Sequence, residues 1–348
     1  MPPFAYFYIK IRLGLKGSIQ HIPRLGQLFV LLGIYLIGEY IFILTAIGII
    51  DLIFPGIDFI HFITDLSKIK SADQINLQQE QALKIYQFTT SVGRFILVSI
   101  FFIYLKGERF VESVSLNKSM KLTSYLVVLA TVVASGAIIS VVHNWNQMVH
   151  LPASLSNIEA DMRFMESQAE LQTEVFLRTT DVGGFILNII IIGLLAAVGE
   201  EIFFRGLVQN IFFKATKNPH AAIWIAAFLF SFIHFQFFGF FPRLLMGALL
   251  GYLYYYSGSL WSAILAHFFN NVVTVIAYYL MNTGVIEKNI AETANIWAAL
   301  ASVPIVLLLL RYFKQHETAL SLSDGKRLDD DLLDNRQDES NFHKRDVE

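Results

Sequence analysis

Long apolar runs, seldom interrupted by charge, restrict the fold of this sequence more than any other feature does. Several runs reach the length of about 20 helical residues that crosses a bilayer. Because lipid offers no hydrogen bonds to the backbone, only helices and closed barrels span it. The runs are continuous rather than alternating in hydropathy, which disfavours barrel strands. The sequence therefore predicts an all-α, polytopic transmembrane helix bundle.

Eight segments are candidate transmembrane helices. They are residues 27–54, 85–105, 123–142, 183–212, 220–241, 243–257, 259–281 and 295–312. They divide the chain into five regions. These are an N-terminal segment (1–26), N-terminal helices with two loops (27–182), a core that holds the polar residues described below (183–281), a last helix (282–314) and a disordered tail (315–348).

The overall composition fits a membrane protein and excludes several other classes. Charged residues make up 16% of the chain, whereas a soluble domain carries about 25%. The net charge of −2 gives no reason to expect a nucleic-acid partner. The chain has no cysteine. Disulfides, thiolate catalysis and Cys-ligated zinc are therefore excluded.

The distribution of Lys and Arg predicts the orientation in the membrane. Basic residues gather before the first candidate helix and after the second, fourth and eighth. Because positive loops stay inside, both termini are expected to be cytoplasmic, in a plasma membrane. The loops at 55–84 and 143–182 then lie outside. Their apolar residues at helical spacing fit either amphipathic helices on the outer surface or ordinary folded loops.

Ionisable residues occur inside the fourth, fifth and seventh candidate helices, and in the fourth two of them form a pair at helical spacing. Each such group costs roughly 2.5–3.5 kcal/mol in lipid, so its presence calls for a reason. Glu201 and Arg205 are four residues apart and share one helix face. Glu200 is rotated about 100° from Glu201. We therefore expect Arg205 to hold Glu201 and leave Glu200 free as a general base.

Two further helices contribute His234 and the pair His267 and Asn271. A lone buried histidine is more often a structural hydrogen-bonding residue than a catalytic one. At about 1.5 Å per residue, however, these three residues and Glu200 lie roughly 13–21 Å from the inner surface. One polar cluster near the middle of the membrane, reachable from the cytoplasm, explains all of them.

Such a cluster suits the hydrolysis of an amide bond by an activated water. A carboxylate and an imidazole activate the water, and an imidazole and a carboxamide stabilise the oxyanion. Glu200, His234 and His267 are equally candidate ligands of a divalent metal such as zinc. The HExxH motif of zinc proteases is absent. A metal-assisted and a metal-free mechanism both remain open.

Three sequence motifs resemble the CPBP family, which contains type II CAAX prenyl proteases and bacteriocin-processing and immunity (Abi) proteins. They are EEIFFRGLVQ (200–209), FSFIH (230–234) and LLGYLYYYSGSLWSAILAHFFNN (249–271). They fit, in order, the family pattern EExxxR, FxxxH and HxxxN. The resemblance implies an intramembrane protease that acts on a peptide or membrane-protein substrate.

The resemblance also assigns roles to individual residues. Glu200 would be the catalytic carboxylate that activates water, with His234 as its partner. His267 and Asn271 would form the oxyanion site. Glu201 and Arg205, the other two residues of the first motif, would hold the helix and adjust the properties of Glu200.

Two functions other than proteolysis also fit these residues. The same fold suits a non-catalytic membrane scaffold or a bacteriocin-immunity partner. Buried carboxylates and histidines also build ion or proton pathways, although such a pathway would not need Asn271.

A second ion pair is expected among the N-terminal helices. Glu39 lies in the middle of the first candidate helix and Arg94 in the second. If these helices are antiparallel, both residues lie at a similar depth. We predict that they pair, the alternative being that Arg94 extends to the outer interface.

Overall fold

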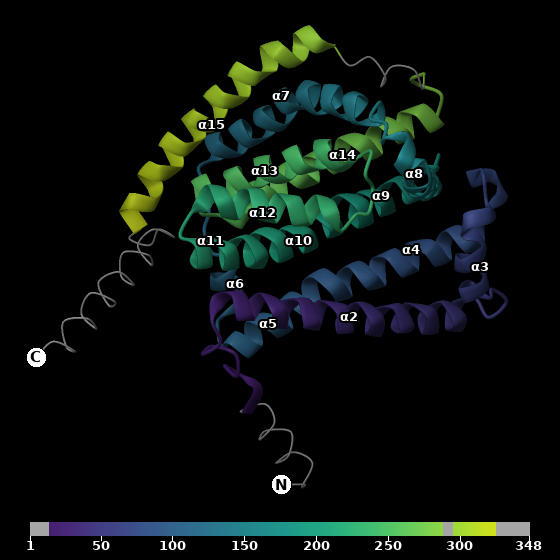
Figure 1. Cartoon of the computed structure of the whole chain (residues 1–348), viewed down its shortest axis with the longest axis horizontal. Coiled ribbons are helices and arrows are strands. Elements are labelled where there is room, and N and C mark those ends of the chain that lie inside the picture. The colour runs from purple at the N-terminus through teal and green to yellow at the C-terminus, as the bar shows by residue number, and fades with distance from the viewer. Residues whose placement is uncertain (1–13, 288–294, 325–348) are drawn as a thin grey trace, which may run out of the picture.

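The computed structural model describes residues 14–287 and 295–324, with side chains up to 317. Every regular element in these ranges is a helix, and together they form a membrane-type bundle. Figure 1 shows the long helices lying roughly side by side. One of them, 77–106, contains α4 (Leu77–Ser91) and α5 (Val98–Lys106), and another, 182–216, contains α9 (Val182–Asn188), α10 (Ala196–Glu201) and α11 (Asn210–Thr216). The others are α2 (Arg24–Ile53), α7 (Leu122–Gln147), α12 (Pro219–Phe232), α13 (Phe240–Ser257), α14 (Leu260–Asn282) and α15 (Ile296–Asp324).

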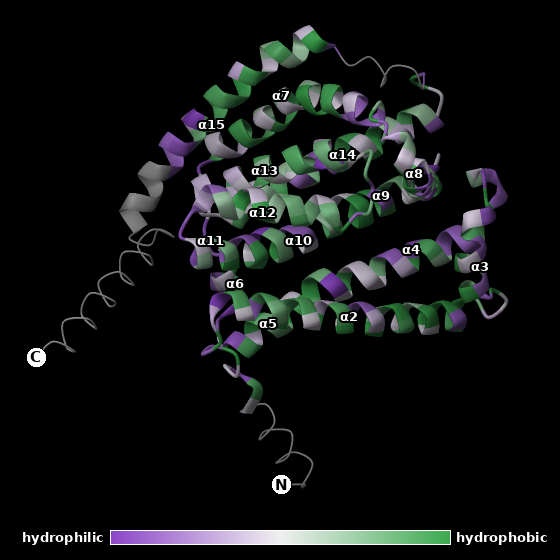
Figure 2. Cartoon of the chain, in the orientation of Figure 1, coloured by the Kyte–Doolittle hydropathy of each residue, from purple (hydrophilic) through white to green (hydrophobic). Residues whose placement is uncertain are grey.

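Three shorter or peripheral helices distinguish the two ends of the bundle (Figure 1). The helices α3 (Phe59–Asp65) and α8 (Ser156–Leu177) lie at one end, called the α8 end below. The helix α6 (Phe110–Ser113) lies at the opposite end, called the α6 end. Hydrophobic residues dominate the long helices, and hydrophilic ones gather toward both ends (Figure 2). This pattern is expected of a protein with an apolar belt in lipid.

Within the described ranges, six helical stretches are long and apolar enough to cross a membrane, so the chain is a multi-pass membrane protein. They are 24–53, 77–106, 122–147, 182–216, 260–282 and 296–317. The predicted count of eight is not confirmed. The fifth and sixth candidates correspond to α12, which has only 14 residues, and to α13, which has 18.

The predicted helix at 220–241 is wrong at its C-terminal end. α12 stops at Phe232, and residues 233–239 form a non-helical connection to α13. Phe235 within it has φ +52°, a left-handed conformation that no continuous helix contains. Hydropathy did not reveal this break, because four of the seven residues in the connection are Ile or Phe.

The helix α15 extends further than the sequence predicted. It runs to Asp324, although the tail was expected to begin at 315. Phe313 is fully buried, and Ser124 of α7 donates a hydrogen bond to Glu317. These contacts with the bundle continue the helix beyond its apolar run. The predicted disorder of 325–348 concerns residues outside the described part, as does the first half of the predicted N-terminal segment, 1–13.

The interior of the bundle is aromatic where the helices meet. Phe204 contacts Phe203 and Phe230 with ring centroids 5.2 Å apart in both cases. Phe95 joins them from the π-helical stretch between α4 and α5 (Val92–Leu97), 5.8 Å from Phe203. Large apolar side chains also cover the outside, as on α2, where Phe29 is 74% exposed. An apolar surface around a packed core is what a lipid-facing bundle requires.

The predicted pair of Glu39 and Arg94 is confirmed. Arg94 Nε lies 3.2 Å from Glu39 Oε2, and Arg94 Nη2 donates to Thr90 Oγ1 at 3.1 Å. The distance makes an ion pair, although the angle at Nε is too poor for a hydrogen bond. Attraction between opposite charges therefore joins α2 to the helix that begins with α4.

We expect Arg94→Ala to destabilise the protein more than the Glu39→Ala/Arg94→Ala double variant does. A single substitution leaves an unpaired charge, which costs roughly 3–5 kcal/mol in a fully buried site. Both side chains keep some exposure, 22% and 24%, so we expect about 1–3 kcal/mol here. Thermal unfolding in detergent measures the difference. Equal losses in the single and double variants would show that the pair contributes nothing.

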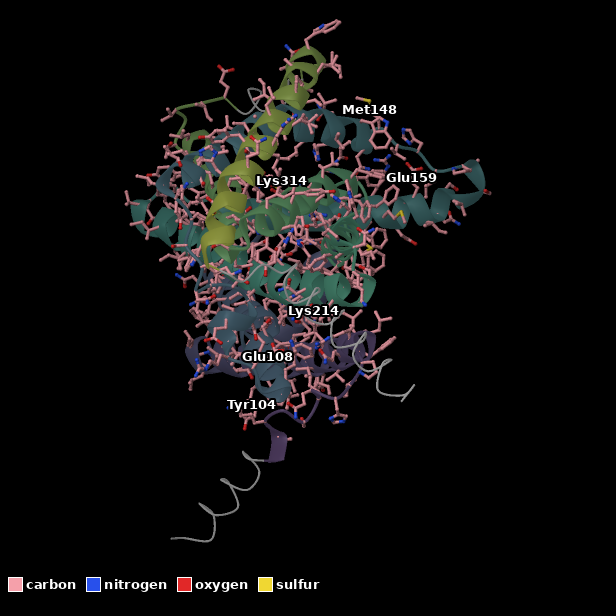
Figure 3. The ribbon with its side chains drawn as sticks, turned by 90° about the vertical axis from the view of Figure 1, so that its left-hand side faces the viewer. Tyr104, Glu108, Met148, Glu159, Lys214 and Lys314 are labelled. Atoms are coloured by element: carbon pink, nitrogen blue, oxygen red, sulfur yellow. The ribbon has the colours of Figure 1, made fainter. Side chains whose placement is uncertain are left out.

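The loop predicted at 143–182 contains α8, which has 22 residues. Figure 3 shows this helix extending to one side of the molecule, with Glu159 near its start. Glu159 accepts hydrogen bonds from Leu151 N at 2.7 Å and Arg163 Nε at 2.9 Å. Its carboxylate also lies 2.9 Å from His150 Nδ1. These contacts join the beginning of α8 to the segment that precedes it.

The contacts of Glu159 predict a dependence of stability on pH. The Leu151 N–H, His150 and Arg163 lower the pKa of Glu159 from 4.5 to about 2. Because the pKa of Glu159 is lower in the folded protein, its contacts stabilise the fold fully above pH 4.5. This stabilisation is lost as the pH falls toward 2. The difference in Tm between wild type and Glu159→Gln should therefore be constant from pH 7 to about 5 and shrink below that. A difference that does not change at acid pH would contradict this.

Candidate active site

The buried carboxylate of Glu201 organises the polar centre of the bundle. Its Oε1 accepts hydrogen bonds from Arg205 Nη1 at 2.6 Å and from His267 Nδ1 at 2.8 Å. The pair of Glu201 and Arg205 is as predicted, and both side chains are buried, at 0% and 1% exposure. The bond to His267 was not predicted. It ties α10 to α14, so Glu201 positions a second residue of the site as well as pairing with Arg205.

Arg205 is held by more than its carboxylate partner. Its Nη2 donates to the Gly247 carbonyl of α13 at 2.9 Å, and its guanidinium lies 4.7 Å from the centre of the Phe230 ring. One turn further on, Gln209 Nε2 donates to the Gly251 carbonyl at 3.2 Å. A Cβ on Gly251 would lie 2.8 Å from Gln209 Oε1, so glycine permits this close approach.

Sequence reasoning missed Gln209 and the two glycines of α13. The signal was present as a polar stripe at i, i+4 and i+8 (Glu201, Arg205 and Gln209). It was also present as small residues four apart at 247 and 251, a spacing typical of helices packed closely in membranes.

The helix that carries Glu200 and Glu201 is irregular on both sides of them. π-helical stretches run from Ile189 to Leu195 and from Ile202 to Gln209. Such stretches often mark functional sites, because they change which side chains face inward and leave backbone carbonyls open to other donors. One such carbonyl, that of Ile192, accepts a hydrogen bond from Asn271 Nδ2 at 2.9 Å.

Glu200 differs from its neighbour in having no hydrogen-bond partner among the described residues. Its side chain keeps 15% exposure, and its Oε2 lies 4.0 Å from His267 Nε2. A carboxylate only accepts hydrogen bonds, so His267 Nδ1 carries the proton that binds Glu201. The other nitrogen, Nε2, is therefore directed toward Glu200. Helical phase predicted this division between a held Glu201 and a free Glu200.

His234 lies beside these residues but is not bonded to them. It follows the end of α12, where its Nδ1 donates to the Phe230 carbonyl at 2.7 Å. The Phe230 ring contacts both imidazoles, with centroids 5.2 Å from His234 and 6.0 Å from His267. Because Nδ1 is occupied by the backbone, Nε2 is the nitrogen of His234 left for chemistry.

Asn271 lies one turn beyond His267 on α14, as predicted. Besides its bond to Ile192, it accepts a hydrogen bond from Asn270 Nδ2 at 3.3 Å. A carboxamide nitrogen has two hydrogens, so the bond to Ile192 leaves one free to donate.

The three candidate metal ligands do not gather into a metal site. Within the described ranges, no group of three or more His, Asp or Glu side chains is close enough to hold an ion. His267 uses Nδ1 to bind Glu201, and His234 uses Nδ1 to bind the backbone. Both rings keep Nε2 for a ligand, as metal-bound histidines do, so a metal-assisted and a metal-free mechanism both stay predictions, and the mechanism proposed below contains no step through a metal.

Part of the chain is similar to a known family. Residues 182–273 match the family model of the type II CAAX prenyl endopeptidases, described as Rce1-like. Neither the curated proteins nor the solved structures compared with the chain give a match. The matched segment holds Glu200, Glu201, Arg205, His234, His267 and Asn271. The segment 182–273 is therefore similar to the Rce1-like type II CAAX prenyl endopeptidases, and this likeness is consistent with the CPBP family.

Proposed function

We propose that this chain is an intramembrane endopeptidase that hydrolyses a peptide bond with a water activated by Glu200. The observation that carries the proposal is the contrast between two adjacent carboxylates. Glu201 is fully buried and bonded to Arg205 and His267, whereas Glu200 is partly exposed and faces His267 Nε2. A carboxylate free of partners beside a fixed imidazole is suited to take a proton from water.

The proposed reaction proceeds in two steps. Glu200 takes a proton from water as the water oxygen attacks the carbonyl carbon of the peptide. The oxyanion that forms is stabilised by donors from His267 and from the free N–H of Asn271. His234 Nε2 orients the water. When the tetrahedral intermediate collapses, the proton held by Glu200 passes to the leaving nitrogen, which restores the carboxylate.

The donors of this proposed oxyanion site are fixed before substrate binds. Glu201 accepts the Nδ1 proton of His267 and so fixes the orientation of its ring, with Nε2 toward Glu200. Asn271 is held against the backbone of the helix that carries Glu200. Groups that need no reorganisation during the reaction stabilise a developing charge most effectively.

The proposed substrate is a peptide or membrane-protein segment of the CAAX type, prenylated or not, after which the matched family is described. The proposed location is a plasma membrane with both chain termini in the cytoplasm, because Lys and Arg gather on that side.

The test is cleavage of a panel of prenylated and unprenylated CAAX peptides by the purified protein in lipid nanodiscs. We expect wild type to cleave, and Glu200→Ala and His234→Ala to fold but not cleave. Retained cleavage in either variant would contradict the mechanism. A cellular phenotype that survives both substitutions would instead support a non-catalytic scaffold.

A further inference from the structure

His234 lies on a strained segment of backbone, residues 233–239, called the His234 loop below. Phe235, directly after His234, has φ +52°. This is an unfavourable conformation for a bulky side chain, and it persists only where surrounding contacts impose it. Phe235 is 65% exposed. Its own contacts are to Phe232, whose carbonyl accepts the Phe235 N–H at 3.1 Å and whose ring lies 5.9 Å away. Contacts of the rest of the loop add to these.

The helix α8 supplies two of these contacts, both to Phe238. Glu166 Oε2 accepts a hydrogen bond from Phe238 N at 3.2 Å. The guanidinium of Arg163 lies 4.1 Å from the centre of the Phe238 ring, which is 1% exposed. The next residue, Gly239, is also close to α8, since a Cβ there would lie 3.5 Å from Glu166 Oε1. One face of α8 therefore holds the second half of the His234 loop.

Two other elements also support the loop or the residues directly after it. Arg243 of α13 donates to Gln236 at 2.6 Å. Asn146, at the end of α7, accepts from Phe241 N at 3.1 Å, beyond the loop itself. Among the described residues, α8 is the element outside 182–273 that bonds directly to the loop.

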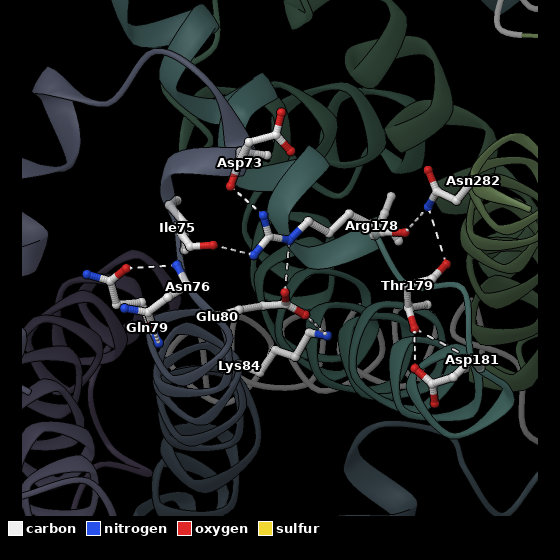
Figure 4. Close-up of polar contacts among 12 residues, drawn as sticks. Asp73, Ile75, Asn76, Gln79, Glu80, Lys84, Arg178, Thr179, Asp181 and Asn282 are labelled. Atoms are coloured by element: carbon white, nitrogen blue, oxygen red, sulfur yellow. Dashed lines mark hydrogen bonds and ion pairs between the residues drawn. The ribbon is translucent and has the colours of Figure 1, made fainter.

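The helix α8 is itself anchored at both ends. Glu159 binds the preceding segment at its start, as described above. At its C-terminal end, Arg178 Nε donates to Glu80 Oε2 of α4 at 2.9 Å, and Arg178 Nη2 donates to the Ile75 carbonyl at 2.5 Å (Figure 4). Asn282, the last residue of α14, donates to the Leu177 carbonyl at 2.7 Å. A helix held at both ends can keep a strained loop in place.

We propose that α8 positions His234 for the reaction, with Glu166 as the positioning residue. Glu166 would touch no reacting atom and would act through the Phe238 backbone. The inference rests on the proposed function, because it assigns His234 a catalytic role. It extends the functional unit beyond residues 182–273 to a helix on which the sequence shows no catalytic motif.

The chain contains no cysteine, so one engineered cysteine can carry a probe without background labelling. A nitroxide attached at Phe235→Cys reports the mobility of the loop by electron paramagnetic resonance. We expect Glu166→Ala to increase that mobility. Glu166→Gln should preserve it, because the amide oxygen still accepts the Phe238 N–H. The matched control is Glu174→Ala, which removes an exposed carboxylate from the same helix and should change nothing.

The second readout is peptide cleavage by the same substitutions in the unlabelled, cysteine-free protein. We expect Glu166→Ala to lower kcat by about 10-fold to 100-fold with little change in KM, since misplacing a catalytic group by about 1 Å can cost 100-fold. Glu166→Gln should keep most of the wild-type kcat. Unchanged mobility in Glu166→Ala would overturn the inference, as would increased mobility with an unchanged kcat. If His234→Ala keeps full activity, the proposed function fails, whereas the mobility result still shows whether α8 holds the loop.

Discussion

Glu200→Gln is expected to lower kcat by about 1,000-fold or more, because an amide cannot accept the proton of the attacking water. Removal of a general base typically costs a factor of about 10² to 10⁴. The substitution keeps the shape of the side chain. Glu200 is 15% exposed and has no hydrogen-bond partner among the described residues. The loss should therefore appear in kcat while thermal unfolding in detergent stays close to that of wild type.

The adjacent residue provides the control for this prediction. Glu201→Gln changes the same functional group in the same helix, but it removes the charged partner of Arg205. Its main effect should be on stability. Glu200→Asp keeps a carboxylate and withdraws it by about 1.5 Å, so activity should fall less than in Glu200→Gln. More than a tenth of wild-type kcat in Glu200→Gln would show that another group activates the water.

Two kinds of ion pair could be predicted from the sequence: a pair within one helix, and a pair between two helices at the same depth in the membrane. The bond between Glu201 and Arg205 follows from the spacing of four residues, and the pair of Glu39 and Arg94 follows from the cost of an unpaired charge in lipid. Both predictions depend on local geometry or on a strong energetic penalty. The helical class of the fold was predictable for the same reason, since lipid permits few structures.

Contacts set by the way helices cross could not be predicted. The bond between His267 and Glu201 depends on the approach of α14 to α10, which no spacing in the sequence encodes. The end of α12 was missed because the left-handed conformation of Phe235 is imposed by tertiary contacts rather than by local composition. Glu166 on α8 was missed too, since its partner is a backbone N–H far along the chain.

Arg205→Met is expected to destabilise the protein by about 3–5 kcal/mol, the typical cost of breaking a buried ion pair from one side. Both side chains are essentially inaccessible, at 1% and 0% exposure, so solvent screening does not reduce this cost. Glu201 Oε2 already lacks a partner, and loss of Arg205 leaves the whole carboxylate with His267 alone. Thermal unfolding in detergent and abundance in the membrane should both fall.

The double variant Glu201→Gln/Arg205→Met separates the ion pair from the placement of His267. It removes both buried charges, so it should be more stable than Arg205→Met alone. The amide oxygen that Glu201→Gln introduces can still accept the Nδ1 proton of His267. The double variant should therefore keep measurable cleavage, because Glu200 and His267 remain in place. If it is no more stable than Arg205→Met, the charges are not coupled, and Arg205 acts through its contacts with Gly247 and Phe230 instead.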